Sequence, residues 1–171
     1  MRSMPKLMLL GTLLLLACEE GDGHHHDHHH APGDEDASIE GDAAAFVGCP
    51  SSTPVFGPGM QATGNRSNIT ATLVTASSVP PQRYLNDWTI ALSNQQGEPV
   101  SDVEVIEARP FMPVHGHDGN IKPNVEKLAA PGQLSIAGIN LLMRGPWEVQ
   151  LMLSSKSAGS DYVVFHVCVE E

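Results

Sequence analysis

Hydrophobic and polar residues alternate in short stretches over the last two thirds of the chain. Each stretch is seven to ten residues long, and a period of two is typical of strands that turn one face to a core. Turn signals rich in Gly, Asn, Pro and Asp separate the stretches, and none keeps helical periodicity for three turns. The predicted strands are residues 69–77, 87–93, 102–108, 133–139, 146–154 and 161–170.

Regular short strands without helices predict an all-β fold. We expect an immunoglobulin-like antiparallel β-sandwich of about seven strands, in which two sheets bury their apolar faces against each other. The strand at 146–154 is the clearest, because Trp147 and three aliphatic residues share one face while Glu148 lies on the other. Residues 46–171 are therefore predicted to form a single domain.

The first 17 residues have the pattern of an export signal. Arg2 and Lys6 precede an apolar run at 7–16, which is too short to span a bilayer comfortably. The run closes on Leu-Leu-Ala-Cys, which resembles the lipobox of bacterial lipoproteins. The resemblance implies a signal peptide at 1–17 and lipid on Cys18, which would anchor the protein in the bacterial cell envelope without a spanning helix. Glu19 after the cysteine implies the outer membrane, facing the periplasm, rather than the inner membrane.

Residues 18–45 are predicted to be a disordered tether. Between 19 and 42 there are nine acidic residues, six histidines and no basic residue, so little apolar surface is present to bury. Neutral imidazoles bind copper, zinc and nickel. The histidine tract at 24–30 therefore predicts either metal capture or a solvated, pH-sensitive spacer that binds metal incidentally. Its candidate ligands are His24, His25, His26, His28, His29 and His30.

The charge balance limits the classes of partner. Loss of the signal would leave 7 basic against 20 acidic residues, a net charge of 7 − 20 = −13 with neutral histidine. Such a chain attracts cations and should not bind nucleic acid. The domain has only three histidines and neither a Gly-x-Ser-x-Gly nor a zinc-protease motif, so we expect no enzyme.

Cys49 and Cys168 are the only cysteines that follow Cys18. In an oxidising compartment they predict a disulfide, which would close a loop of more than a hundred residues and contribute roughly 4 kcal/mol. The bridge would clamp the N-terminal segment over the outer face of the sheet beside His166, itself expected to be packed or hydrogen-bonded. A pair of free redox or copper-binding thiols is the alternative, although neither cysteine belongs to a CxxC motif.

The segment 109–120 concentrates the candidate chemistry. Its prolines and glycines oppose a helix, so we expect a structured loop between strands. His115 and His117 are two residues apart, and an extended backbone would turn both imidazoles to the same side. Met112 could add a thioether, and imidazole with thioether is a donor set that suits copper.

Residues 88–153 resemble the YtkA-like family, small envelope β-sandwiches that also resemble FixH-type proteins. The resemblance rests on Met112-Pro113-Val114-His115-Gly116-His117, on the Pro-Gly turn at 131–132, and on Gly145-Pro146-Trp147-Glu148-Val149. Members are linked with copper handling and with the assembly of copper enzymes. The resemblance therefore implies a copper-binding module without catalysis, whose partner would be a copper enzyme or an assembly factor.

Carried onto this chain, the resemblance implies Met112, His115 and His117 as metal ligands. Met143 is a candidate fourth ligand, and Asp118 a candidate acceptor for an imidazole N–H. Each residue also has a structural interpretation: a methionine that fills the core, and histidines that hold a turn. The alternative function is accordingly a non-enzymatic, immunoglobulin-like protein-interaction module with a structural histidine loop.

Overall fold

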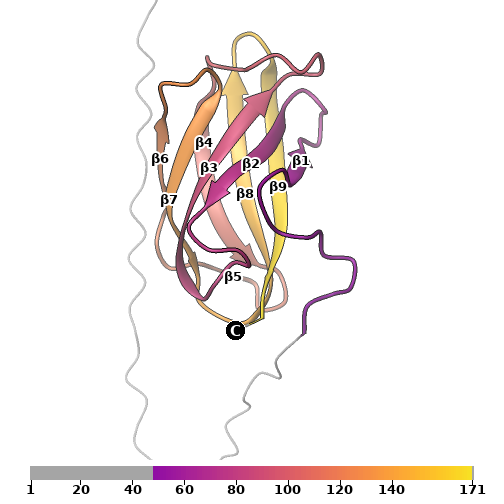
Figure 1. Ribbon diagram of the computed structural model, residues 1–171, viewed down its shortest axis with the longest axis vertical. Helices are drawn as coiled ribbons and strands as arrows, with labels where there is room; N and C mark the ends of the chain where they lie inside the picture. Colours follow the sequence, from indigo (N-terminus) through magenta and orange to yellow (C-terminus); the bar gives the residue numbers. More distant parts are fainter. Residues whose placement is uncertain (1–47, 171) are drawn as a thin grey trace, which may run out of the picture. The chain divides into compact units, whose positions relative to one another are not determined.

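The computed structural model describes residues 48–170, which form two antiparallel sheets packed face to face (Figure 1). One sheet has the order β1-β2-β3-β7-β6 and the other β5-β4-β8-β9. The predicted all-β sandwich is confirmed, with nine strands where about seven were expected. The strands are β1 Gln61–Thr63, β2 Thr70–Ala76, β3 Tyr84–Ser93, β4 Glu104–Met112, β5 His117–Asp118, β6 Asn124–Lys127, β7 Gln133–Leu141, β8 Gly145–Ser155 and β9 Gly159–Val169.

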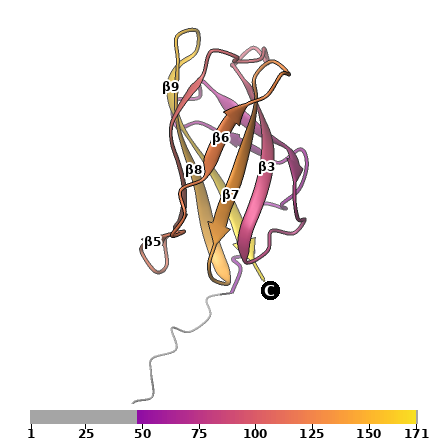
Figure 2. The same ribbon diagram turned by 90° about the vertical axis from the view of Figure 1, so that its left-hand side faces the viewer.

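The chain crosses between the two sheets three times in its central part, including once between β5 and β6. Strand β3 pairs with β7 rather than with β4, and the β3–β4 and β7–β8 connections each pass to the other sheet. Figure 2 shows β3, β7 and β6 together in one layer, with β8 and β9 in the other. Among residues 48–170 no helix is long and apolar enough to cross a membrane.

Apolar side chains from both sheets meet in one core. Trp88 of β3 lies between two other rings, with centroid distances of 5.3 Å to Phe56 and 5.8 Å to Phe165. The predicted inward faces of the last two strands are confirmed, since alternate residues from Trp147 to Leu153 and from Val163 to Val169 are buried. Burial of each such side chain contributes about 1.5–3 kcal/mol, which fixes the register of the hairpin.

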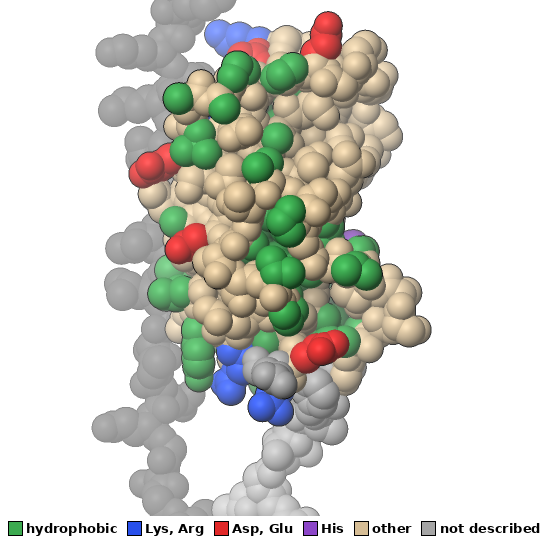
Figure 3. Space-filling model, in the orientation of Figure 1, with side chains coloured by type: hydrophobic (Ala, Val, Ile, Leu, Met, Phe, Trp, Pro, Cys, Tyr) green, Lys and Arg blue, Asp and Glu red, His purple; other side chains and the backbone are tan. Residues whose placement is uncertain are grey.

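The central part of the outer face of the five-stranded sheet carries small, uncharged side chains. They alternate with the buried residues of β2, β3 and β7 and include Thr70, Thr72, Thr89, Ser93 and Ser135. Figure 3 views this face and shows the charged side chains toward its margins.

Strand β4 differs from the prediction, because it continues to Met112 where a loop was expected from residue 109. A register shift between Val105 and Glu107 moves its buried positions to Ala108 and every second residue after it. The Pro110 carbonyl accepts a hydrogen bond of 2.8 Å from the Gly119 N–H, so this residue turns its peptide groups away from β8. The missing N–H of proline therefore removes no bond from the β4–β8 ladder.

The predicted disulfide is confirmed between Cys49 and Cys168, with Cα atoms 5.7 Å apart. It attaches the N-terminal strap (residues 49–54) to the end of β9. Pro50, Ser52 and Thr53 of the strap line a groove with His166 and Val167, so the strap lies over the outer face of β9 as expected.

Candidate functional site

The segment 109–120 is a β-hairpin rather than a loop. Met112 at the end of β4 pairs with His117 at the start of β5, and the turn between them is closed by two hydrogen bonds to the Met112 carbonyl. The N–H groups of His115 and Gly116 donate these bonds, at 3.2 and 2.8 Å. Gly116 has φ +65°, a left-handed conformation that glycine adopts without steric cost. The hairpin thus fixes where both histidines lie.

The two imidazoles lie side by side at the end of the sandwich. Their ring centroids are 5.9 Å apart and their planes differ by 27°. The His117 ring also meets the edge of Trp147 at a centroid distance of 5.7 Å. Trp147 is buried, and its indole N–H donates to the Met143 carbonyl at 2.9 Å. The histidine pair therefore rests on a rigid element of the core, although His115 reaches it from a turn and not from an extended strand.

One nitrogen of His117 is oriented by the backbone. Its Nδ1 lies 3.0 Å from the carbonyl oxygen of Asp118. A carbonyl oxygen only accepts, so this hydrogen bond requires a proton on Nδ1 and leaves the lone pair on Nε2. A metal-binding histidine is commonly oriented by such a bond.

The carboxylate of Asp118 does not serve as the predicted acceptor for an imidazole. It receives a bond of 2.7 Å from Arg109 Nε, while the guanidinium carbon of Arg109 lies 4.5 Å from the centre of the Phe111 ring. Asp118 instead ties β5 to β4 through this ion pair. The sequence did not predict this role because it depends on the β4–β5 register.

The two methionines occupy different positions. Met112 is fully buried and belongs to the core, as its structural interpretation requires. Because Met112 and His117 are directly paired, their side chains lie on the same face of the sheet, and Cβ atoms in such pairs are about 5 Å apart. Met143 is partly buried against the core and contacts the site through its carbonyl.

The donors around the hairpin fit copper better than zinc. In the part of the chain that the structure describes, no three His, Cys, Asp or Glu side chains gather closely enough to hold a metal. Zinc prefers imidazole, carboxylate or thiolate donors to a thioether. Two imidazoles with a thioether on the paired strand position form a softer donor set, which suits copper(I). Cys18 and the six histidines of the tract lie outside the described residues.

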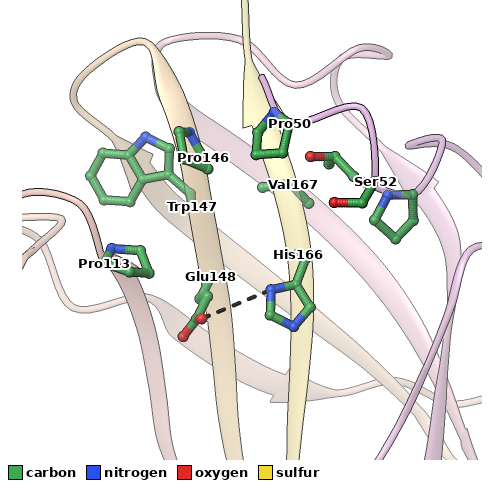
Figure 4. A pocket seen from close by; sticks show the side chains of 10 residues that line it. Pro50, Ser52, Pro113, Pro146, Trp147, Glu148, His166 and Val167 are labelled. Carbon is green, nitrogen blue, oxygen red and sulfur yellow. Dashed lines mark ion pairs between the residues drawn. The ribbon is translucent and has the colours of Figure 1, made fainter. Parts of the chain in front are cut away.

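A groove of about 430 Å³ opens beside the hairpin, between Pro113 and the N-terminal strap. Glu148 and His166 lie on its floor (Figure 4). The side chain of His166 is 61% exposed, so it is not packed, and its Nδ1 atom lies 3.8 Å from Oε1 of Glu148, beyond hydrogen-bond distance. The interpretation of His166 as a packed or hydrogen-bonded histidine is therefore wrong. The groove joins four segments that are separate in the sequence, so the sequence pattern gave no indication of it.

The fold and the hairpin define a two-sheet β-sandwich domain that carries a histidine pair at one end. A family model described as YtkA-like matches residues 64–152, just over half of the chain. The chain belongs to the YtkA-like family, as its resemblance implied, and the match indicates an envelope domain. Neither the curated proteins nor the solved structures contain a match to this chain.

Proposed function

We propose that this protein is a membrane-anchored envelope lipoprotein that binds copper ions at the β4–β5 hairpin and delivers them to a copper enzyme or assembly factor. The copper is cargo, and the chain has no catalytic role. The observation that carries the proposal is the stacked pair of His115 and His117 rings, with centroids 5.9 Å apart, on a hairpin that pairs His117 with the buried Met112.

The geometry supports an ion that can be exchanged. Both imidazoles are only half-buried, so an ion between them would keep one side open to a partner's ligands. The hydrogen bond from His117 Nδ1 to a carbonyl would present Nε2 to the metal. Trp147 under the His117 ring would limit its motion and so reduce the entropy lost on binding.

The tether completes the proposal. Lipid on Cys18 would hold the protein at the membrane, with the outer membrane facing the periplasm as the favoured site. The histidine tract at 24–30 would capture copper, zinc or nickel and raise the local concentration of copper near the hairpin.

The test is a copper(I) competition titration on a full chain whose six tract histidines are replaced by asparagine. We expect one tight equivalent that is lost in the His115→Asn/His117→Asn variant and retained in the matched His166→Asn control. The proposal would be overturned if the His115→Asn/His117→Asn variant bound copper(I) as tightly as the chain that lacks only the tract histidines, or if that chain bound no copper(I).

The second candidate is a non-enzymatic protein-interaction module. The threonine and serine side chains on the outer face of β2 and the second half of β3 favour it, because depletion of charge is a feature of the centre of protein interfaces. In that case the titration would show no copper at the hairpin. Substitution of an outward threonine by a charged residue, Thr72→Lys, would then abolish capture of the partner without loss of stability.

A further inference from the structure

The floor of the groove presents a carboxylate and an imidazole to each other. Glu148 of β8 and His166 of β9 are directly paired across the two strands, on the face opposite the core. The Glu148 Oε1 and His166 Nδ1 atoms face each other at 3.8 Å (Figure 4). This separation is too long for a hydrogen bond.

Both atoms are free to take another ligand. The other carboxylate oxygen, Oε2, accepts a hydrogen bond of 2.6 Å from Gln150 Nε2, which orients the group and leaves Oε1 facing His166. No lysine or arginine lines the groove, and Arg109, the nearest cation on β4, is paired with Asp118. Within residues 48–170, the Glu148 carboxylate therefore has no basic partner other than His166.

The 3.8 Å separation fits two ligands of one metal ion. With metal–ligand bonds of about 2.1 Å, two ligands at the tetrahedral angle lie about 3.4 Å apart. A small rotation of the exposed His166 ring would close the difference. The hydrogen bond from Gln150 supports the carboxylate in the way that outer partners support metal ligands.

The walls of the groove leave room for further oxygen ligands. Ser52 and Thr53 of the N-terminal strap line it, and Figure 4 shows Ser52 on the strap side of the groove. Prolines stiffen both sides, and the disulfide holds the strap in place. Hydroxyl oxygens and water would fill the positions that the two strand residues leave open.

We propose that Glu148 and His166 form a second metal site, for a divalent ion such as Zn²⁺, Cu²⁺ or Ni²⁺. An imidazole with a carboxylate is a harder donor set than imidazoles with a thioether, so this site selects the divalent state while the hairpin selects copper(I). The two sites share no ligand, and this proposal stands without the function proposed for the hairpin.

The experiment is a calorimetric Zn²⁺ titration of the full chain with the tract histidines replaced by asparagine. We expect one equivalent whose affinity falls at least about tenfold in both Glu148→Gln and His166→Gln. The His115→Asn/His117→Asn variant and the matched carboxylate control Glu107→Gln should keep it. Thermal unfolding checks that all variants remain folded, since each replaced side chain lies outside the core.

A site-resolved measurement removes any dependence on the variants. Sub-stoichiometric Cu²⁺ should broaden the amide resonances of residues 147–149 and 165–167 through its unpaired electron. The proposal would be overturned if the chain without tract histidines bound no Zn²⁺ equivalent. It would also be overturned if Glu148→Gln and His166→Gln bound Zn²⁺ as tightly as that chain does, or if Cu²⁺ broadened only the resonances of the hairpin. Failure of copper(I) binding at His115 and His117 would leave it intact.

Discussion

A side chain on Gly64 would occupy the space of the Asp161 carboxylate. A Cβ atom built on this glycine overlaps the carboxyl carbon and both oxygens of Asp161. We expect Gly64→Ala to lower the free energy of unfolding by about 2 kcal/mol, because overpacking displaces a buried group. Gly57→Ala is the matched control, since its Cβ would meet only Val79 at an ordinary 3.7 Å. Chemical denaturation measures both, and equal stability would contradict the prediction.

The same carboxylate ties the β1–β2 turn to β9. Asp161 accepts hydrogen bonds of 2.8–3.0 Å from the N–H groups of Arg66, Asn68, Ile69 and Tyr162. Burial alone would raise the pKa of Asp161, but these four bonds together hold it below its ordinary value of 3.8. Asp161→Asn should therefore cost about 3 kcal/mol at neutral pH, since it places an NH₂ among donors.

The cost of Asp161→Asn should also depend on pH. A carboxyl group with a depressed pKa stabilises the fold above its unfolded pKa, and this contribution is lost as the pH falls through the folded value. The difference in unfolding free energy between wild type and variant should therefore shrink below about pH 4. A difference that does not change between pH 7 and pH 2.5 would show that the charge of Asp161 has no such role.

A second carboxylate, Asp102, lies at the same end of the sandwich and binds the turn between β8 and β9. The Ser155 and Ser157 hydroxyls donate to Asp102 at 2.7 and 2.8 Å, and these bonds lower the pKa of Asp102 to about 2. Ser155→Ala removes the strongest of them and should raise the pKa of Asp102 toward 3.8. A carboxyl-resolved NMR titration measures this shift, with Ser154→Ala as the control that should leave it unchanged.

The disulfide should contribute most of its stability through the unfolded chain. Cys49 and Cys168 are 119 positions apart, and a loop of this length corresponds to about 5 kcal/mol in the chain-entropy model. Reduction, or the Cys49→Ser/Cys168→Ser pair of substitutions, should lower the melting temperature while far-UV circular dichroism at low temperature still reports the sheets. A reduced protein with the melting temperature of the oxidised form would refute the prediction.

Met112 can be tested as a core residue and as a ligand separately. Leucine has a similar volume, so Met112→Leu should change the free energy of unfolding by less than about 1.5 kcal/mol. Met112→Ala should cost about 3 kcal/mol because it leaves a cavity. A thioether ligand predicts that Met112→Leu weakens copper(I) binding at unchanged stability. A copper affinity equal to that of the wild type would assign Met112 to packing alone.

The sequence predicted those parts of the fold that depend on alternation of burial. Strands β8 and β9 follow it for eleven residues each, so their inward faces and the position of Cys168 on the other face were evident. The short strands β1, β5 and β6 were not predicted, because two to four residues do not establish a period. They form only where longer strands offer an edge to pair with.

The sequence indicated which residues form the candidate site, but not how they are arranged or which partners they contact. The spacing of His115 and His117 indicated that the imidazoles lie together, and the structure brings them together. The partner of Asp118 depends on the pairing of β4 with β5, which a proline in the strand concealed. Glu148 and His166 are eighteen positions apart, and only the β8–β9 register brings them face to face.

The bond between Cys49 and Cys168 also determines how the domain would carry tension. A pull on the chain before Cys49 would otherwise peel away the strap and then β1, which has only three residues. The sulfur bridge diverts that load to the end of β9, where eleven consecutive residue pairs with β8 resist it in shear. If the chain is anchored before Cys49 as we propose, a pull on the anchor would reach β9 first and leave the hydrophobic core closed.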